Sequence, residues 1–398
     1  MAKDYLESVD PMRFFELNAV RQQTFAQAPE TPLPETYPVN DLAAELHPAK
    51  QYATIAKVSD RAGDCKSYTL VPDASKGTDR LAYFAAGQYV TVFLTIDDRP
   101  VTRAYSISSS PKQALEGSYE LTVKLVEGGT ASTYILENWT EGDSVELSGP
   151  AGAFEYVGLR DARTVVCAAG GSGITPFMSM ARAISEGDED FDMILLYGNR
   201  TADEAIFKDE LDELSAASGR IQVVHVLSDE ERTGYEHGFI SAELIKRYAP
   251  ADEPYSLFVS GPQQMIDYER GQAEKLGLAP KYVRCDLYGE IHDATAQVGY
   301  PGGPDTVQVT VHIMDETYTI TADAHDTLLQ TMEKHGIAAP NRCRCGDCGF
   351  CRSLLKSGEV FAPEKLEHRR KADLDYGYIH PCCTFPLSDV EIEVPHSK

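Results

Sequence analysis

The 398-residue sequence lacks the features of several classes of protein. No stretch approaches the roughly eighteen apolar residues that a membrane helix needs, so no transmembrane segment is expected. The N-terminus lacks a basic region followed by an apolar run, which predicts a cytoplasmic protein without a secretory signal. Basic residues are outnumbered, with 36 Lys and Arg against 62 Asp and Glu and a net charge of −26. This acidity argues against nucleic acid and anionic membranes as partners; it keeps the protein soluble or helps to dock a basic partner.

A disulfide framework is also missing, although the chain has nine cysteines. Six of them lie between residues 343 and 383, whereas Cys65, Cys167 and Cys285 are scattered. Such clustering indicates a metal or cluster site in a reducing compartment rather than a set of disulfide bonds.

Three of the clustered cysteines, Cys343, Cys348 and Cys351, follow the pattern C-x4-C-x2-C, and a fourth cysteine lies at a distance from them. This is the ligand spacing of a plant-type [2Fe–2S] cluster, which accepts and passes single electrons. Zinc is the alternative, because thiolates also bind zinc. A structural zinc site pairs two short hooks, however, and the adjacent Cys382 and Cys383 would point in opposite directions in an extended chain. The spacing therefore favours the iron–sulfur cluster.

Residues 306–398 resemble a plant-type ferredoxin domain. The segment 343–351 matches the cluster loop of that family, and the segment 357–360 matches the strand that follows it. The resemblance implies a β-grasp fold, in which one helix packs against the sheet. Asp326 is a candidate N-cap for this helix, and Gly336 is a candidate for the residue just after its end.

The resemblance also implies which cysteine is the fourth ligand. Cys382 lies four residues before Pro386, and this register matches the family's last ligand and last strand. Cys382 is therefore favoured over Cys383. Cys345 and Cys383 are then spare thiols, expected to be small buried or loop side chains.

Two further patterns precede this domain. Residues 51–158 contain six short strand candidates without a long helix, which predicts an antiparallel β-barrel. Its expected strands are Gln51–Ser59, Lys66–Val71, Gln88–Ile96, Arg103–Ser108, Tyr119–Val126 and Ser144–Ser148. Residues 159–288 alternate short apolar strands with helical patterns, which predicts a parallel α/β sheet. Its expected strands are Thr164–Ala168, Met193–Tyr197, Ile221–Val226 and Leu257–Ser260.

The remaining segments read as connections. Residues 1–50 are expected to be an appendage, with a helix that starts at Asp10-Pro11 and a Pro-rich linker over residues 29–38. It either packs on the main body or docks a partner. Residues 289–305 have no hydrophobic periodicity and are expected to be a second linker.

A strand of the predicted barrel carries Arg103, Ala104, Tyr105 and Ser106. A bound flavin needs a cation for its phosphate, an aromatic surface for its ring and a hydrogen-bond donor near its redox nitrogens. The segment resembles the R-x-Y-S motif of the ferredoxin–NADP reductase superfamily. The resemblance implies that Arg103, Tyr105 and Ser106 supply these three groups.

A glycine-rich loop follows the next strand and ends in Gly128, Gly129 and Ser132. It matches the superfamily's pyrophosphate loop, where glycine allows close backbone approach and a helix N-terminus offers N–H groups. A pyrophosphate is present in FAD but not in FMN. FAD is therefore the predicted flavin.

The first strand of the α/β region ends in a second glycine-rich turn with Gly171, Gly173, Thr175 and Pro176. Pro176 breaks the usual G-x-G-x-x-G dinucleotide fingerprint. The superfamily, however, has G-x-G-I-x-P at this place. The resemblance implies that the turn and Thr175, at a helix N-terminus, face the nicotinamide nucleotide.

A third motif, Ser260-Gly261-Pro262, matches the superfamily's C-G-P with serine in place of cysteine. The resemblance implies that Ser260 lies beside the hydride path, together with Ser106 and Thr175. The serine keeps the size of the cysteine but changes its polarity. Hydride transfer is then expected to be slower or differently tuned.

The end of the second α/β strand should contact the adenosine ribose of the nucleotide. Arg200 could hold the 2′-phosphate of NADPH, with Lys208 further on, but Asp203 and Glu204 disfavour a phosphate. A modest preference for NADH follows from the acidic pair.

Residues 51–398 as a whole resemble the iron–sulfur flavoprotein reductases of oxygenase systems, with the domain order of the phenylacetyl-CoA epoxidase reductase type. The resemblance implies an enzyme that passes electrons from NADH or NADPH through FAD to a [2Fe–2S] cluster. A redox partner protein (an oxygenase, a reductase or a carrier) would accept them. The alternative is an electron-transfer subunit of a larger complex without independent turnover.

Overall fold

The computed structural model describes residues 11–28, 36–287 and 289–396. The chain forms two compact units, Met1–Ala44 and Glu45–Lys398. The predicted helix start at Asp10 and most of the predicted Pro-rich linker (residues 29–35) lie outside the described residues. None of the described helices is long and apolar enough to cross a membrane.

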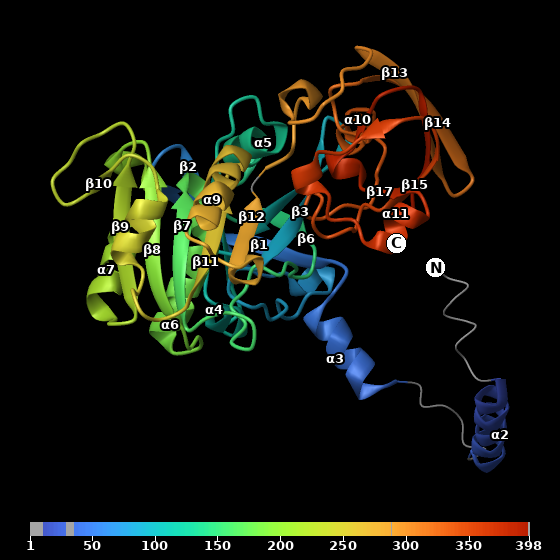
Figure 1. Cartoon of the computed structure of the whole chain (residues 1–398), viewed down its shortest axis with the longest axis horizontal. Helices are drawn as coiled ribbons and strands as arrows, with labels where there is room; N and C mark the ends of the chain where they lie inside the picture. The colour runs from blue at the N-terminus through green and yellow to red at the C-terminus, as the bar shows by residue number, and fades with distance from the viewer. Residues whose placement is uncertain (1–10, 29–35, 288, 397–398) are drawn as a thin grey trace. The chain divides into compact units, whose positions relative to one another are not determined.

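The N-terminal part contains the helices α2 (Pro11–Gln27) and α3 (Pro38–Leu46), both labelled in Figure 1. The sequence analysis placed Pro38 in the linker, but this residue opens α3. Proline suits the first position of a helix, because its φ is preset and its missing N–H has no partner there in any helix.

The second unit begins with an antiparallel six-stranded sheet in the order β4-β3-β6-β1-β2-β5. The two outer strands approach each other, because an antiparallel bridge joins Ile107, just after β4, to Leu121 of β5. The sheet therefore curls into the predicted barrel around one apolar core. Its elements are β1 (Gln51–Arg61), β2 (Cys65–Pro72), β3 (Tyr89–Ile96), β4 (Arg99–Ser106), α4 (Pro111–Leu115), β5 (Tyr119–Lys124), α5 (Thr130–Asn138) and β6 (Ser144–Leu147).

The next domain is a parallel six-stranded sheet in the order β10-β9-β8-β7-β11-β12. Its strands are β7 (Thr164–Gly170), β8 (Asp192–Asn199), β9 (Ile221–Leu227), β10 (Glu236–His237), β11 (Tyr255–Gly261) and β12 (Val283–Leu287). The α/β prediction is confirmed, although the edge strands β10 and β12 were not predicted. The helices are α6 (Thr175–Glu186), α7 (Lys208–Ala217), α8 (Ala242–Tyr248) and α9 (Gln263–Lys275).

Alternate residues of the central strand β7 pack on opposite faces of this sheet. Val165 and Cys167 belong to one apolar cluster with α6 and α7, and Val166 and Ala168 belong to another with α8 and α9. Helices therefore cover both faces of the sheet (Figure 1). This layering places the ends of the strands, and the glycine turn after β7, at an open edge where a ligand can bind.

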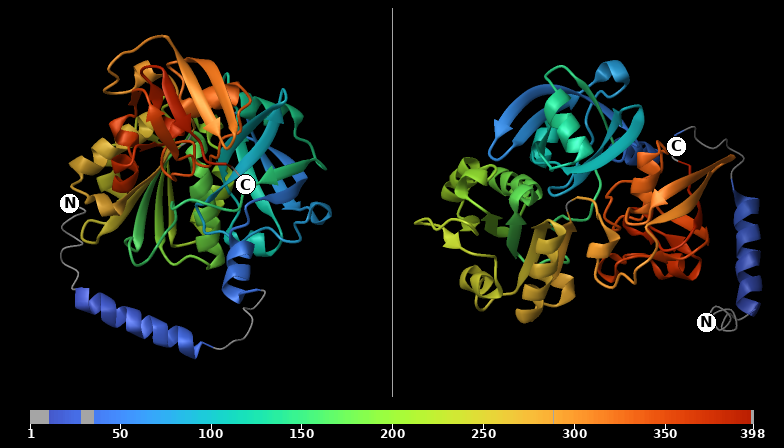
Figure 2. Two further views of the ribbon diagram at one scale, coloured as in Figure 1. Left: turned by 90° about the vertical axis from the view of Figure 1, so that its right-hand side faces the viewer. Right: turned by 90° about the horizontal axis from the view of Figure 1, so that it is seen from above.

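The C-terminal domain has a five-stranded sheet in the order β14-β13-β19-β15-β17 and a separate β16–β18 pair. These strands are β13 (Thr306–Ile313), β14 (Glu316–Asp323), β15 (Ser353–Ser357), β16 (Val360–Phe361), β17 (Tyr378–Ile379), β18 (Phe385–Pro386) and β19 (Val390–Glu393). The helices are α10 (Leu328–Lys334) and α11 (Lys371–Asp375), and α10 buries its apolar side chains in the core of this domain. The right-hand view of Figure 2 shows the three domains of the second unit as separately coloured bodies.

The N-cap of α10 is Thr327, not the predicted Asp326. The Thr327 hydroxyl accepts a hydrogen bond from the Gln330 N–H, and the Gln330 side chain accepts one from the Thr327 N–H. This reciprocal pair forms a capping box, and the sequence analysis overlooked it. Gly336 lies just after the helix with a φ of 73°, as predicted.

Part of the segment predicted as a linker (residues 289–305) is packed rather than free. Ile291 and Ala294 are buried in the core of the C-terminal domain, and Ala294–Ala296 form a short 3-10 helix. The segment is thus anchored to the domain that follows it.

Candidate functional site

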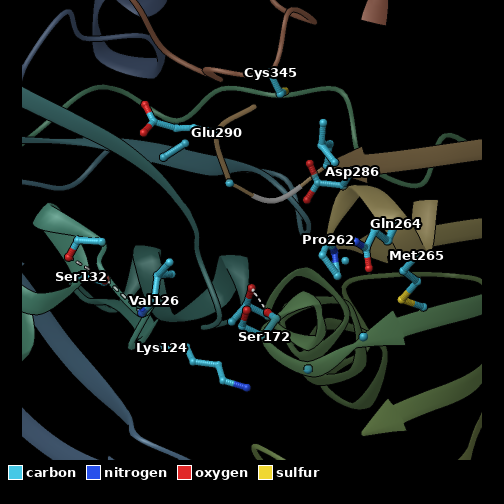
Figure 3. A pocket seen from close by; sticks show the side chains of 18 of the residues that line it. Lys124, Val126, Ser132, Ser172, Pro262, Gln264, Met265, Asp286, Glu290 and Cys345 are labelled. Atoms are coloured by element: carbon cyan, nitrogen blue, oxygen red, sulfur yellow. Dashed lines mark hydrogen bonds between the residues drawn. The ribbon is translucent and has the colours of Figure 1, made fainter. Parts of the chain in front are cut away.

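A cavity of about 1140 Å³ is lined by residues of all three domains of the second unit. Figure 3 shows Cys345 and Glu290 along one side of this pocket and Lys124 and Ser172 along the other. Most of the residues predicted to bind a cofactor line it. They are Arg103, Ala104, Tyr105, Ser106, Gly128, Gly129, Ser132, Gly171, Thr175, Arg200, Gly261 and Pro262. The pocket therefore collects the flavin and nicotinamide motifs at one place.

The end of β4 forms the flavin side of the pocket. Ala104 to Ser106 line the cavity, and burial raises the pKa of the Tyr105 phenol, so this ring stays neutral. A neutral aromatic ring suits stacking against a flavin. Arg103 also lines the cavity, but its guanidinium is held by the Glu290 and Glu333 carboxylates at 3.1 and 2.9 Å. Its predicted role at the flavin phosphate stays a prediction.

The glycine loop before α5 has the form of an anion cradle. The Ser132 hydroxyl accepts a hydrogen bond from the Val126 N–H at 3.1 Å and closes the loop. A Cβ atom at Gly129 would meet that hydroxyl and the Val126 Cβ, each at 2.9 Å, so only glycine fits. Gly129 is also the N-cap of α5 and forms no side-chain cap, which leaves backbone N–H groups of α5 for an anion. This geometry fits the pyrophosphate of FAD.

The nicotinamide side of the pocket lies at the glycine turn after β7. Gly171 lines the cavity in the left-handed region, with a φ of 52°. Gly173 lies behind this wall, because a Cβ atom there would meet the Ser260 carbonyl oxygen at 2.1 Å. Pro176 and Ser260 are also buried and do not line the cavity. The structure thus places Gly173, Pro176 and Ser260 behind the cavity wall.

Lys124 was missed by the sequence analysis. It is the last residue of β5, lines the pocket, and its Nζ would lie 3.8 Å from a Cβ atom at Gly171. Within the described part of the chain it forms no ion pair. A cation directly before an anion-binding loop was the signal that could have identified it.

The ribose end of the pocket contains a paired arginine. Arg200 binds the Glu204 carboxylate through two nitrogens, at 3.1 and 3.2 Å. Lys208 is bound to Asp212 at 2.7 Å and does not line the cavity. Of the two cations considered for a 2′-phosphate, Arg200 is paired with Glu204, and Lys208 lies outside the pocket.

Two acids that the sequence analysis did not single out also line the pocket, the half-buried Asp286 and the buried Glu269. Burial raises the pKa of Asp286 to about 7, with the negative charges of Asp347 and Cys343 adding to the effect. Its strand neighbour is Ser260, whose hydroxyl lies beside the carboxyl without forming a well-aligned hydrogen bond. Burial also raises the pKa of Glu269, to about 8. Signals for these residues were weak, because single acids in a strand or helix are common.

The four predicted cluster ligands bring their sulfur atoms together. Cys343 interacts with Cys348 and Cys382, and the sulfur atoms of Cys351 and Cys382 are 3.4 Å apart. Backbone N–H groups point at the sulfurs, at 3.3 Å from Cys348 to Cys343 and at 3.2 Å from Gly346 to Cys382. Donors aimed at sulfur stabilise thiolates, as the ligands of an iron–sulfur cluster require. The donor set therefore fits a [2Fe–2S] cluster.

The two spare cysteines differ in their surroundings. The Cys383 thiol points at the carbonyl oxygens of His380 and Leu366, at 3.5 and 3.9 Å. Cys345 is in contact with Cys343 and lines the large pocket. No group of three His, Cys, Asp or Glu side chains in the described ranges is arranged around a single metal ion.

Three family comparisons cover the second unit. The Oxidoreductase FAD-binding domain matches residues 53–156, and the Oxidoreductase NAD-binding domain matches residues 168–270. The 2Fe-2S iron-sulfur cluster binding domain matches residues 311–387. The predicted cofactors FAD, nicotinamide nucleotide and [2Fe–2S] are confirmed.

Related proteins share this domain order. The chain is 29% identical over 357 residues to the glycine betaine monooxygenase reductase subunit of Pseudomonas aeruginosa, which covers 85% of this chain and 93% of that protein. The solved structure of phthalate dioxygenase reductase has the same fold, with a TM-score of 0.62 and 23% identity over 91% of this chain and all of that chain. The chain is 30% identical to the 3-ketosteroid-9-alpha-monooxygenase, ferredoxin reductase component of Mycobacterium tuberculosis, over 91% of this chain and 98% of that one. It belongs to the same family, the iron–sulfur flavoprotein reductases that carry electrons from NAD(P)H through FAD to a [2Fe–2S] cluster.

Proposed function

We propose that this protein is the reductase component of an oxygenase system and delivers electrons one at a time to a separate oxygenase. The observation that carries the proposal is the shared pocket. It is lined by the flavin strand β4, by the glycine turn after β7 and by Cys343, the first cluster cysteine. A nicotinamide, a flavin and a cluster bound by these groups would therefore be neighbours, as an electron chain requires. The names of the related proteins support an oxygenase as the acceptor.

We further propose the roles of the residues that line the pocket. Bound flavin accepts electrons in pairs as hydride and releases them singly. Tyr105 would support its ring, Ser106 would donate a hydrogen bond near its redox nitrogens, and the Gly128–Ser132 loop would hold its pyrophosphate. Thr175 would border the path of the hydride, and Ser260 would lie behind the cavity wall, next to that path. The cluster ligands would be Cys343, Cys348, Cys351 and Cys382.

The limits of the domains are also proposals. We place the flavin domain at residues 51–158, the nicotinamide domain at 159–288 and the ferredoxin domain at 306–398, with a linker between the last two. The clustered cysteines support a reducing, cytoplasmic location.

The test of the proposed function is independent turnover. Purified protein with bound FAD and cluster should oxidise NADH and rapidly reduce an artificial one-electron acceptor, such as cytochrome c. Protein that shows no such turnover alone, but copurifies with other subunits in a fixed ratio, would contradict the proposal. It would then be an electron-transfer subunit of a larger complex.

The preferred nucleotide is proposed to be NADH. The 2′-phosphate of NADPH would meet Arg200, but Glu204 already binds this cation through two contacts and adds its own negative charge. We expect Glu204→Gln to raise kcat/KM for NADPH by about tenfold, since it removes the competing charge. Asp203→Asn is the matched control beside it, because Asp203 is exposed and does not line the pocket. A wild-type kcat/KM about tenfold higher for NADPH than for NADH would reverse the assignment.

A further inference from the structure

Four charged side chains from four separate segments form one network, which we call the four-charge network: Arg103, Glu290, Glu333 and Arg344. Arg103 of β4 contacts Glu290 at 3.1 Å and Glu333 at 2.9 Å. Arg344 contacts the same two acids, at 2.8 Å for Glu333. Each acid is therefore shared between one arginine of the flavin domain and one arginine of the cluster loop.

The network is well shielded from solvent. The exposed fraction of the side chains is 2% for Arg344, 12% for Glu290, 16% for Glu333 and 19% for Arg103. Two positive and two negative charges balance each other. Removing one charge would leave an uncompensated neighbour in a shielded place, which is costly.

Two features besides its ion pairs hold Arg344 in place. It also donates a hydrogen bond to the Thr102 hydroxyl of β4 at 3.1 Å. Its backbone has a φ of 60°, in the left-handed region that residues with a Cβ rarely adopt. Such a conformation persists only where the surroundings hold it in place. Arg344 stands between Cys343 and Cys345, so a fixed Arg344 fixes the cluster loop.

We propose that the four-charge network positions the cluster loop against the flavin strand and so sets the gap that electrons cross from flavin to cluster. Glu290, Glu333 and Arg344 line the pocket, and we treat them as positioning residues because their contacts are with one another and with Arg103 and Thr102 of β4. This inference rests on the proposed function and deepens it. The rate of a single-electron transfer falls steeply as the gap between donor and acceptor widens, so the exact position of the loop matters.

The electron count places the network at one defined step. NADH and one proton give NAD⁺ and a flavin reduced by two electrons and two protons. These electrons then pass singly to the cluster and on to the one-electron acceptor protein, and two protons are released. The network itself is neither oxidised nor reduced. It should therefore affect the single-electron step and leave the hydride step unchanged.

The test variant is Glu333→Gln, which removes the charge shared by Arg103 and Arg344 and changes no cluster ligand. The rate of flavin reduction by NADH, measured by rapid mixing, should stay within about twofold of the wild-type rate. Cluster reduction by the flavin should slow by about tenfold or more. The matched control is Glu359→Gln, the same change at an exposed position of the same domain. It should leave both steps unchanged.

Two further measurements keep the outcome decisive. Light-driven reduction of the flavin starts the single-electron step without NADH. A protein that does not react with NADH can therefore still be tested for electron transfer from flavin to cluster, so a failure of the proposed function is separate from a failure of this inference.

Small-angle scattering should show a larger radius of gyration for Glu333→Gln, because the cluster loop loses its contact with β4. If Glu333→Gln lowers the iron content, the test is repeated with Glu290→Gln. Glu290 lies outside the strands and helices of the ferredoxin domain. Unchanged cluster reduction in a variant with full iron content would overturn the proposal.

Discussion

The flavin domain meets its two neighbours through contacts of different chemistry. At the nicotinamide joint, Phe154 of the flavin domain packs edge-on against Phe177 of α6, with 5.6 Å between ring centres, and at a tilt against Phe258 of β11, with 5.4 Å between ring centres. Ala86 and Cys65 of the flavin domain belong to the same apolar cluster. At the ferredoxin joint, none of the described flavin-domain residues enters the apolar core of the neighbour. The four-charge network and a hydrogen bond from the Thr102 hydroxyl to the Asn341 side chain join the two domains instead.

This difference indicates different tasks for the two joints. Apolar contact is non-directional and strengthens with buried area, so it suits a joint that stays closed. Paired charges fix one geometry, yet they can part when a competing charge or water replaces the partner. Under the proposed function, the hydride path would lie at the apolar joint, and the single-electron path would lie at the charged joint.

The nicotinamide joint also has an ion network, but behind its apolar contacts. Arg182 of α6 binds Glu120 of β5 at 2.8 Å and Glu210 of α7 at 2.7 Å. It donates a further hydrogen bond to the Ser108 carbonyl oxygen at 2.8 Å. None of these four residues lines the large pocket. The comparison can thus be tested on each side separately.

The largest expected effect is the loss of electron transfer through the cluster, with flavin reduction at the nicotinamide joint retained. Cys382→Ser should remove the cluster and its iron, because the fourth thiolate is lost. Electron transfer to cytochrome c should then fall by orders of magnitude, while flavin reduction by NADH continues across the nicotinamide joint. Iron analysis and rapid-mixing spectra measure the two effects. Cys383→Ser is the control and should keep about two irons per chain; equal iron loss in both variants would refute the choice of ligand.

The sequence predicted the three-domain architecture because it depends on local periodicity. The four cysteine ligands, the last of them implied by the resemblance to ferredoxins, stay a prediction. Strand boundaries were less accurate. The expected strand began at Arg103, but β4 begins at Arg99, because a tight hairpin at Asp97 and Asp98 adopts positive φ values of 50° and 60°. Pro100 concealed this start, and it is tolerated because β4 is an edge strand of the sheet.

The contacts between domains could not be predicted from local patterns. Arg103 matched a motif for binding a flavin phosphate, yet its partner Glu333 lies 230 residues away in the sequence. Lys124 carried no motif of its own. Edge strand β12 mixes charged and apolar residues in Val283–Leu287, so its periodicity was weak. These features depend on how the domains fold together, which a single sequence does not display.

The second expected effect concerns the ion network of the nicotinamide joint. Arg182→Met should destabilise the flavin and nicotinamide domains by about 3 kcal/mol, because it leaves the shielded Glu120 with less compensation. Tm should fall by roughly 5–10 °C in thermal unfolding monitored by flavin release. Arg163→Met is the matched control, because the Arg163 side chain is 63% exposed. A similar loss of Tm in both variants would mean that the network at the joint has no special role.

A smaller effect is expected on the pocket side of the same joint. Lys124→Met should raise KM for NADH by about tenfold, equivalent to about 1.4 kcal/mol, because a cation next to the Gly171 turn can hold the nucleotide's phosphates. kcat should change little, since the contact forms equally in the ground state and in the transition state. Lys112→Met, at an exposed position of the flavin domain, is the control in steady-state kinetics. An unchanged KM would place the phosphates away from Lys124.

The last expected effect is a pH dependence of the nicotinamide joint. Burial alone would raise the pKa of Glu120, but the charge and hydrogen bond of Arg182, with the charge of Arg61, outweigh burial and hold this pKa below its ordinary value of 4.5. A carboxyl with a lowered pKa in the folded state stabilises the fold above its unfolded pKa and loses that contribution as pH falls through the folded pKa.

Glu120→Gln should therefore cost about 2 kcal/mol at pH 7, the typical worth of hydrogen bonds to charged groups. The difference in Tm from the wild type should shrink below about pH 4.5. Glu137→Gln, at an exposed site, should show no such convergence. A Tm difference for Glu120→Gln that stays constant from pH 7 to pH 4 would show that the Glu120 charge does not stabilise this joint.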